Sequence, residues 1–61
     1  MKARELVKLI EESGWVFVSQ EGSHMKFRHS DFLYPIIVPN HGSRDLGKGL
    51  ALRILRQAGL R

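Results

Sequence analysis

The first hydrophobic pattern along the chain predicts an amphipathic helix over residues 2–13. Its apolar residues follow the three-and-four spacing that places side chains on one face of a helix, and Gly14 after Ser13 is a typical C-terminal stop. An isolated helix of about a dozen residues is marginal in water, so this one is expected to pack its apolar face against another element. The apolar positions are Ala3, Leu6, Val7 and Ile10.

Three strand-like stretches follow the helix, at residues 15–20, 23–29 and 34–38. The first is rich in aromatic and β-branched residues, and the second alternates between apolar and polar side chains. Pro35 and Pro39 lie near the ends of the third, which suits a strand at the edge of a sheet. Short turn sequences separate the stretches, so neighbouring strands are predicted to run antiparallel.

The last pattern predicts a second helix over residues 44–58. Ser43 is placed to cap it, Asp45 in the first turn suits the helix dipole, and Gly59 ends it. Gly47 and Gly49 lie in the first turns, which indicates either a frayed start or a close approach of the backbone to a phosphate or a partner chain. The apolar stripe consists of Leu46, Leu50, Ile54 and Ala58.

This order of elements predicts an α+β fold. Short connections favour a three-stranded antiparallel sheet in the order α-β-β-β-α, with both helices on one face and the other face left to water or a partner. No linker or repeat divides the chain, so we expect residues 1–61 to form a single domain. The expected core consists of Leu6, Ile10, Phe17, Phe27, Ile36, Leu50 and Ile54.

Composition narrows the range of functions. Ten Lys and Arg residues against six Asp and Glu give a net charge of +4, which favours an anionic partner such as nucleic acid. The absence of cysteine excludes disulfides, thiolate zinc sites and cysteine nucleophiles. The histidines lack the spacing of metal ligands, so we expect no metal and no cofactor. Apolar runs fall far short of the roughly 20 residues that span a bilayer. We therefore expect a cytoplasmic protein with no membrane partner.

The alternating second strand offers candidate chemistry. If Met25 and Phe27 face the helices, the open face carries His24, Lys26 and Arg28. An imidazole can give or take a proton near neutral pH. RNA carries its own nucleophile, the 2′-OH, so its cleavage needs a general base, a general acid and cations that stabilise phosphate charge. The alternative is that His24 is a solvated strand histidine.

The remaining histidines and helix cations leave alternatives open. His41 precedes the second helix and either packs or caps there, or contacts a phosphate. His29 lies at a strand end beside Asp31 and is interpreted as structural or solvated. Three cations of the second helix form either a solvated face or phosphate contacts, namely Lys48, Arg53 and Arg56.

Four short motifs together resemble a known family. They are Gly14-Trp15, then Gly22-Ser23-His24 with Phe27, then Val38-Pro39-Asn40-His41-Gly42, and finally Asp45-Leu46-Gly47-Lys48-Gly49-Leu50 leading into Ile54-Leu55-Arg56-Gln57-Ala58-Gly59-Leu60. In this order and at this length, the chain resembles the HicA toxins, also called YcfA-like, of bacterial and archaeal toxin–antitoxin systems. Two positions depart from the family, because Trp15 stands where phenylalanine is usual and Gly47 where lysine is frequent.

The resemblance implies a fold like that of double-stranded-RNA-binding domains and a type II toxin that cleaves mRNA independently of the ribosome. It implies that His24, in the Gly-Ser-His motif, is catalytic and that a HicB-type antitoxin binds and blocks the protein. The residues expected to bind RNA are Ser23, Lys26, Arg28, His41 and Lys48.

Two other functions remain compatible with the residues. The same fold could bind structured RNA without cutting it, since binding alone needs only cations and shape contacts. The chain could also be a protein-interaction subunit, because the alternation leaves Val16, Val18 and Ile37 on the open face.

Overall fold

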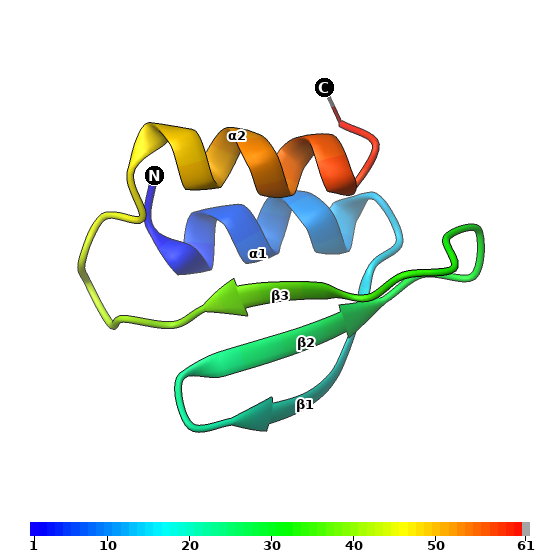
Figure 1. Cartoon of the computed structure of the whole chain (residues 1–61), viewed down its shortest axis with the longest axis horizontal. Coiled ribbons are helices and arrows are strands. Elements are labelled where there is room, and N and C mark those ends of the chain that lie inside the picture. Colours follow the sequence, from blue (N-terminus) through cyan, green and yellow to red (C-terminus); the bar gives the residue numbers. More distant parts are fainter. Residues whose placement is uncertain (61) are drawn as a thin grey trace.

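The computed structural model describes residues 1–60 and contains five elements. Helix α1 spans Ala3–Glu12, strands β1, β2 and β3 span Val16–Glu21, His24–Arg28 and Ile36–Pro39, and helix α2 spans Lys48–Gln57 (Figure 1). The predicted order α-β-β-β-α and the α+β class are therefore confirmed. The bounds of α1 and of the three strands lie within two residues of the predicted ones.

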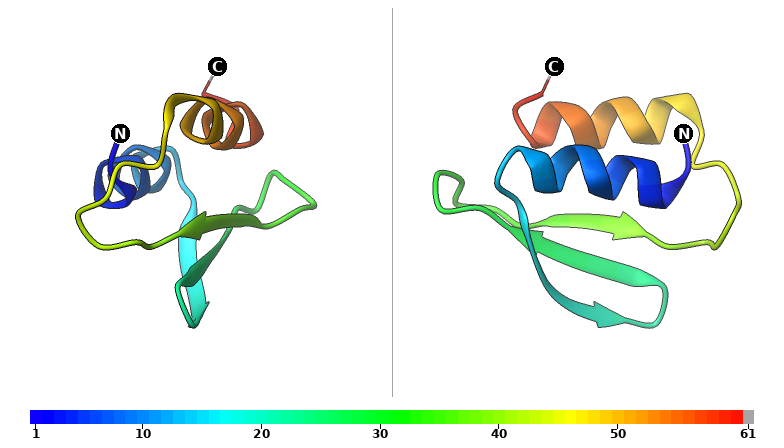
Figure 2. Two further views of the ribbon diagram at one scale, coloured as in Figure 1. Left: turned by 60° about the vertical axis from the view of Figure 1, so that its left-hand side comes forward. Right: turned by 180° about the vertical axis from the view of Figure 1, so that it is seen from behind.

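The strands form one antiparallel sheet in the order β1-β2-β3. Both helices cover the same face of this sheet, as predicted, and they lie above β3 rather than β1 (Figures 1 and 2). Cross-strand partners share a face of a sheet. The pairing of Phe27 with Ile36 and with Phe17 therefore points all three side chains toward the helix layer.

The core lies between β2, β3 and the helices. Of the predicted core residues, Leu6, Ile10, Phe27, Ile36 and Ile54 are buried and Leu50 packs at the rim. The prediction for Phe17 is wrong, because this side chain is 47% exposed. The twist of the sheet carries β1 away from the helices (Figure 2), and the register shifts between Phe17 and Ser19. Phe17 therefore keeps only an edge-to-face contact with Phe27, with 5.7 Å between the ring centroids.

Helix α2 begins at Lys48, four residues later than predicted. The residues before it bond to the start of the chain: the Asp45 carboxylate pairs with the α-amino group of Met1, and the Leu46 N–H donates to the Met1 carbonyl at 2.9 Å. Gly47 is the N-cap, with φ +84°, outside the helical region. The predictions that Ser43 caps this helix and that Asp45 lies in its first turn are therefore wrong.

Candidate active site

The Gly22-Ser23 turn joins β1 to β2 and sets the position of His24. Gly22 has φ +59°, a left-handed conformation that glycine adopts without a Cβ penalty. The Asn40 N–H donates to the Ser23 carbonyl at 2.6 Å, and His24 pairs with Pro39. These contacts hold the Gly-Ser-His motif beside the C-terminal end of β3, although the two segments are distant in sequence.

The predicted faces of β2 are confirmed. Phe27 is 1% exposed and Met25 packs against the core, so His24, Lys26 and Arg28 lie on the open face. Arg28 turns away from the other two, because its guanidinium donates to the Leu33 carbonyl at 3.4 Å in the β2–β3 loop. His24 and Lys26 remain together on the open face.

A hollow of about 390 Å³ lies on this open face. His24 and Lys26 of β2 line it together with four side chains from β1, β3 and the β2–β3 loop, which are Ser19, Glu21, Pro35 and Ile37. We call it the His24 hollow. It combines an imidazole, an ammonium group and an apolar floor, and its opening to solvent suits a polymeric substrate that a closed pocket would exclude.

The imidazole of His24 is exposed, and no other residue within 1–60 forms a hydrogen bond with it. His29, just past the other end of β2, is held at both ring nitrogens. Its Nε2 lies 2.9 Å from the Ser13 carbonyl oxygen, and its Nδ1 accepts from the Asp31 N–H at 3.0 Å. Since Nδ1 is an acceptor, Nε2–H is the donor to Ser13. Of the two interpretations of His29, the structural one is confirmed.

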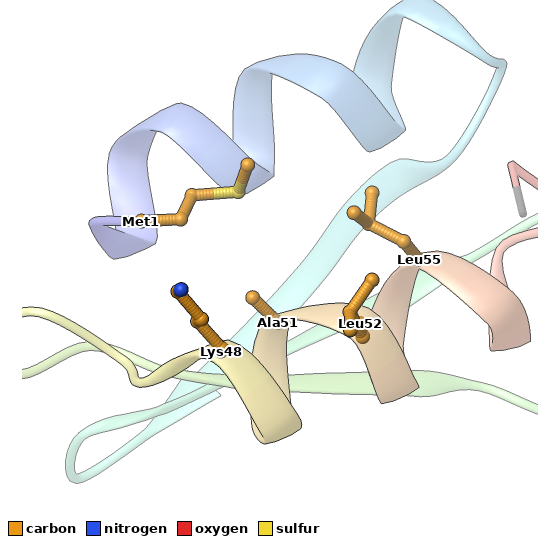
Figure 3. A pocket seen from close by; sticks show the side chains of 5 residues that line it. All are labelled: Met1, Lys48, Ala51, Leu52 and Leu55. Carbon is orange, nitrogen blue, oxygen red and sulfur yellow. The ribbon is translucent and has the colours of Figure 1, made fainter.

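The structure separates the other predicted RNA-binding residues. Ser23 lies in the turn beside His24, and His41 is exposed in the β3–α2 loop, two residues beyond the partner of His24, Pro39. Lys48 lines a different hollow, of about 230 Å³, between α2 and the start of α1 (Figure 3). Its other walls are apolar: Met1, Ala51, Leu52 and Leu55. Lys48 and Arg28 therefore do not line the His24 hollow, and their contact with RNA stays a prediction.

Sequence reasoning placed one further wall of the His24 hollow, Ile37, on the open face and missed the other three. Glu21 falls between the strands predicted at residues 15–20 and 23–29, yet it belongs to β1 and pairs with His24 across the two-residue turn. The turn length is a signal that could have found it, because residues flanking such a turn face each other on one side of the hairpin. Ser19 pairs with Lys26 only because of the register shift in β1. The shift and the approach of Pro35 have no local signal in the sequence.

Two further observations concern ions and membranes. Residues 1–60 contain no group of three or more His, Cys, Asp or Glu side chains that could hold a metal ion. Neither helix in that range is long and apolar enough to cross a membrane.

Two comparisons with known proteins bear on this site. A family model described as "HicA toxin of bacterial toxin-antitoxin" matches residues 3–60. A protein of Pseudomonas fluorescens (strain Pf0-1) named "Probable mRNA interferase HicA" is 31% identical over 61 residues, which is 100% of this chain and 98% of the relative. The match thus includes the Gly-Ser-His turn, the His24 hollow and both helices.

Proposed function

The chain belongs to the HicA toxin family, as its motifs predicted, and on this premise we propose that it is the toxin of a type II toxin–antitoxin system and an endoribonuclease that cleaves mRNA. The name of the relative and the net charge of +4 support this proposal. The match over residues 3–60 also supports a single toxin domain over the whole chain.

The observation that carries the proposed mechanism is the free imidazole of His24 beside Lys26 in one open hollow. In the proposed reaction, the 2′ oxygen of a nucleotide attacks the adjacent phosphorus and the bond from phosphorus to the 5′ oxygen breaks. The 2′-OH loses its proton and the departing 5′ oxygen gains one. His24 acts as general acid or base in this exchange, and no metal takes part.

Lys26 stabilises the negative charge that develops on the phosphate. Glu21, opposite His24, brings a carboxylate to the same hollow, which favours binding at the Lys26 side rather than at the turn. Ser23, Arg28, His41 and Lys48 add contacts to RNA outside the hollow. Because RNA binding releases counterions, affinity should fall with salt by a log–log slope of about −0.7 for each phosphate contacted.

A HicB-type antitoxin is the proposed protein partner. Exposed apolar side chains on the open sheet face support a covering protein, since Val16 is 63% exposed and Val18 is 53% exposed. An antitoxin that covers this face would also cover the His24 hollow, because Ile37 belongs to both.

The test is incubation of the purified protein with a defined RNA in EDTA, beside the His24→Ala variant. The parent should cleave in EDTA, and the variant should lose about 10²–10⁴-fold in rate because general acid–base catalysis is worth that much. RNA binding should persist in the variant, since Lys26 remains. If the parent binds RNA without cutting it under any condition, the protein is a non-catalytic RNA-binding module of the same fold.

A further inference from the structure

A second hollow adjoins the His24 hollow and shares two of its walls. This second hollow, of about 290 Å³, is lined by Pro35 and Ile37, which also line the first, and by four residues of α2: Leu50, Arg53, Ile54 and Gln57. Because β3 is an edge strand of the sheet, no further strand interrupts the surface between β3 and α2. The two hollows therefore lie next to each other, with Pro35 and Ile37 between them, and we call the surface from His24 across β3 to Arg53 the channel.

The channel alternates between cationic and apolar surface. Lys26 and Arg53 supply positive charge in the two hollows, and the shared wall between them is apolar, with Ile37 exposed by 44%. Arg53 is exposed and forms no ion pair with any residue in the range 1–60. Glu21 is the carboxylate in the lining, and it lies at the His24 end. Arg53 is therefore free to contact an anion.

This alternation is typical of a surface for single-stranded nucleic acid. Cations hold the phosphates of such a strand, and apolar or aromatic side chains support its unpaired bases. A double helix keeps its base faces stacked inside, so it has no face to place on Ile37 and Pro35. Charge complementarity thus favours a nucleic acid, and the apolar wall between the two cations favours a single strand over a duplex.

We propose that the channel from His24 to Arg53 holds the single-stranded RNA that flanks the cleaved bond, with Arg53 binding a phosphate and the Pro35–Ile37 wall supporting a neighbouring base. This inference rests on the proposed ribonuclease function and adds the substrate's path and its strandedness. It also gives two of the α2 cations different surroundings. Arg53 lines the channel, whereas Lys48 lines the hollow beside Met1.

Arg56 is the matched control. It lies on the same helix three residues after Arg53 and is exposed, but it lines neither part of the channel. Arg53→Gln and Arg56→Gln each remove one positive charge from α2, so any general effect of net charge on RNA affinity is the same in both. A difference between them reports on the channel alone.

The experiment measures binding of a short, unstructured, fluorescent RNA to the His24→Ala protein with each second substitution, over a series of salt concentrations. Arg53→Gln should weaken binding about 5- to 10-fold at low salt and flatten the log–log salt slope by about 0.7, the value for one phosphate on a single strand. Arg56→Gln should change affinity by less than 2-fold. With His24 intact, Arg53→Gln should lower kcat/KM for cleavage and Arg56→Gln should not.

Several outcomes would overturn the channel. Equal effects of the two substitutions would show that only net charge matters. An equal loss on a blunt RNA duplex would show that Arg53 does not select a single strand. Unchanged RNA binding with weakened binding of the antitoxin would make the channel a protein interface. A parent protein that never cuts RNA, while Arg53→Gln still weakens single-strand binding, would contradict the ribonuclease and leave the channel supported.

Discussion

The two ends of β2 hold histidines in opposite situations. His24 is exposed, and its ring has no hydrogen-bond partner within residues 1–60, whereas both ring nitrogens of His29 are bonded and its ring packs against Trp15 and Phe32 with centroids 5.3 and 5.0 Å away. Because backbone groups occupy both ring nitrogens of His29, neither nitrogen is free to exchange a proton with a substrate. The packed histidine and the proposed proton-transfer group thus lie near opposite ends of one short strand.

The end near His29 is an aromatic cluster that binds the end of α2. The Trp15 indole N–H donates to the Ala58 carbonyl at 3.2 Å, and the Tyr34 hydroxyl donates to the Gln57 carbonyl at 2.8 Å. Carbonyls at a helix C-terminus lack partners within the helix, so these bonds satisfy groups that would otherwise need water. The end near His24 has a two-residue turn and an open hollow instead, and substitutions there should disturb the fold little.

The largest expected effect is at the packed end. Trp15 is 2% exposed, so Trp15→Ala should lower the free energy of unfolding by about 3–5 kcal/mol. Val16→Ala is the control. Val16 is the next residue along the chain and its side chain is exposed, so truncating it should change the free energy of unfolding by less than about 0.5 kcal/mol. Urea unfolding of both variants measures the difference. Similar midpoints for the two would contradict the assignment of stability to the aromatic cluster.

Substitutions at two glycines, one near each end of β2, test the same difference in packing and should have smaller effects on stability. Gly14 has φ +99°, and an added Cβ would lie 2.8 Å from Nε2 of His29, so Gly14→Ala should cost about 2–3 kcal/mol through strain and displacement of that ring. Gly22, at the end near His24, has φ +59° with open space around it, so Gly22→Ala should cost about 1 kcal/mol. Melting temperatures measure both, and an equal loss would mean that His29 is not tightly held.

The smallest expected effect concerns Asp45, whose loop lies at the same end of the molecule as the Gly22-Ser23 turn (Figure 1). The hydrogen bond from the α-amino group of Met1 lowers the pKa of the Asp45 carboxyl below its ordinary value of 3.8. Its contribution to stability is therefore present above that value and is lost as the pH falls through the lower folded pKa.

Asp45→Asn should remove this part of the pH dependence and leave stability at pH 7 slightly reduced, because the pair is exposed. Thermal unfolding between about pH 2 and 5, on either side of the ordinary carboxyl pKa, measures it. A variant whose acid unfolding curve coincides with that of the parent would show that this pair contributes nothing in solution.

Local sequence patterns were sufficient to predict the order of the elements and the two faces of β2. The alternation in β2 correctly placed Phe27 inside and His24 outside, because strand periodicity needs no knowledge of other elements. The start of α2 was mispredicted because Leu46 continues the apolar stripe, while its N–H actually bonds to Met1 at the far end of the chain. The exposure of Phe17 depends on sheet twist and a register shift, which are equally non-local.

Part of the candidate site was likewise predictable from local sequence, and part depends on tertiary packing. His24 and Lys26 are two residues apart on one strand, so the sequence alone brought them together. Arg53 meets the channel only because α2 packs beside the edge of β3, and no spacing along the chain distinguishes it from Arg56. Motifs therefore predicted the proposed proton-transfer group, and only the tertiary structure placed Arg53 beside the wall that the two hollows share.

The most direct test measures His24→Ala and His29→Ala side by side, recording RNA cleavage and melting temperature for each. His24→Ala should keep the parental melting temperature and lose about 10²–10⁴-fold in cleavage rate. His29→Ala should melt earlier, because it loses two hydrogen bonds worth about 0.5–1.5 kcal/mol each, and should still cleave at temperatures where it is folded. A folded His24→Ala protein that cuts RNA within a few-fold of the parent rate would contradict the account.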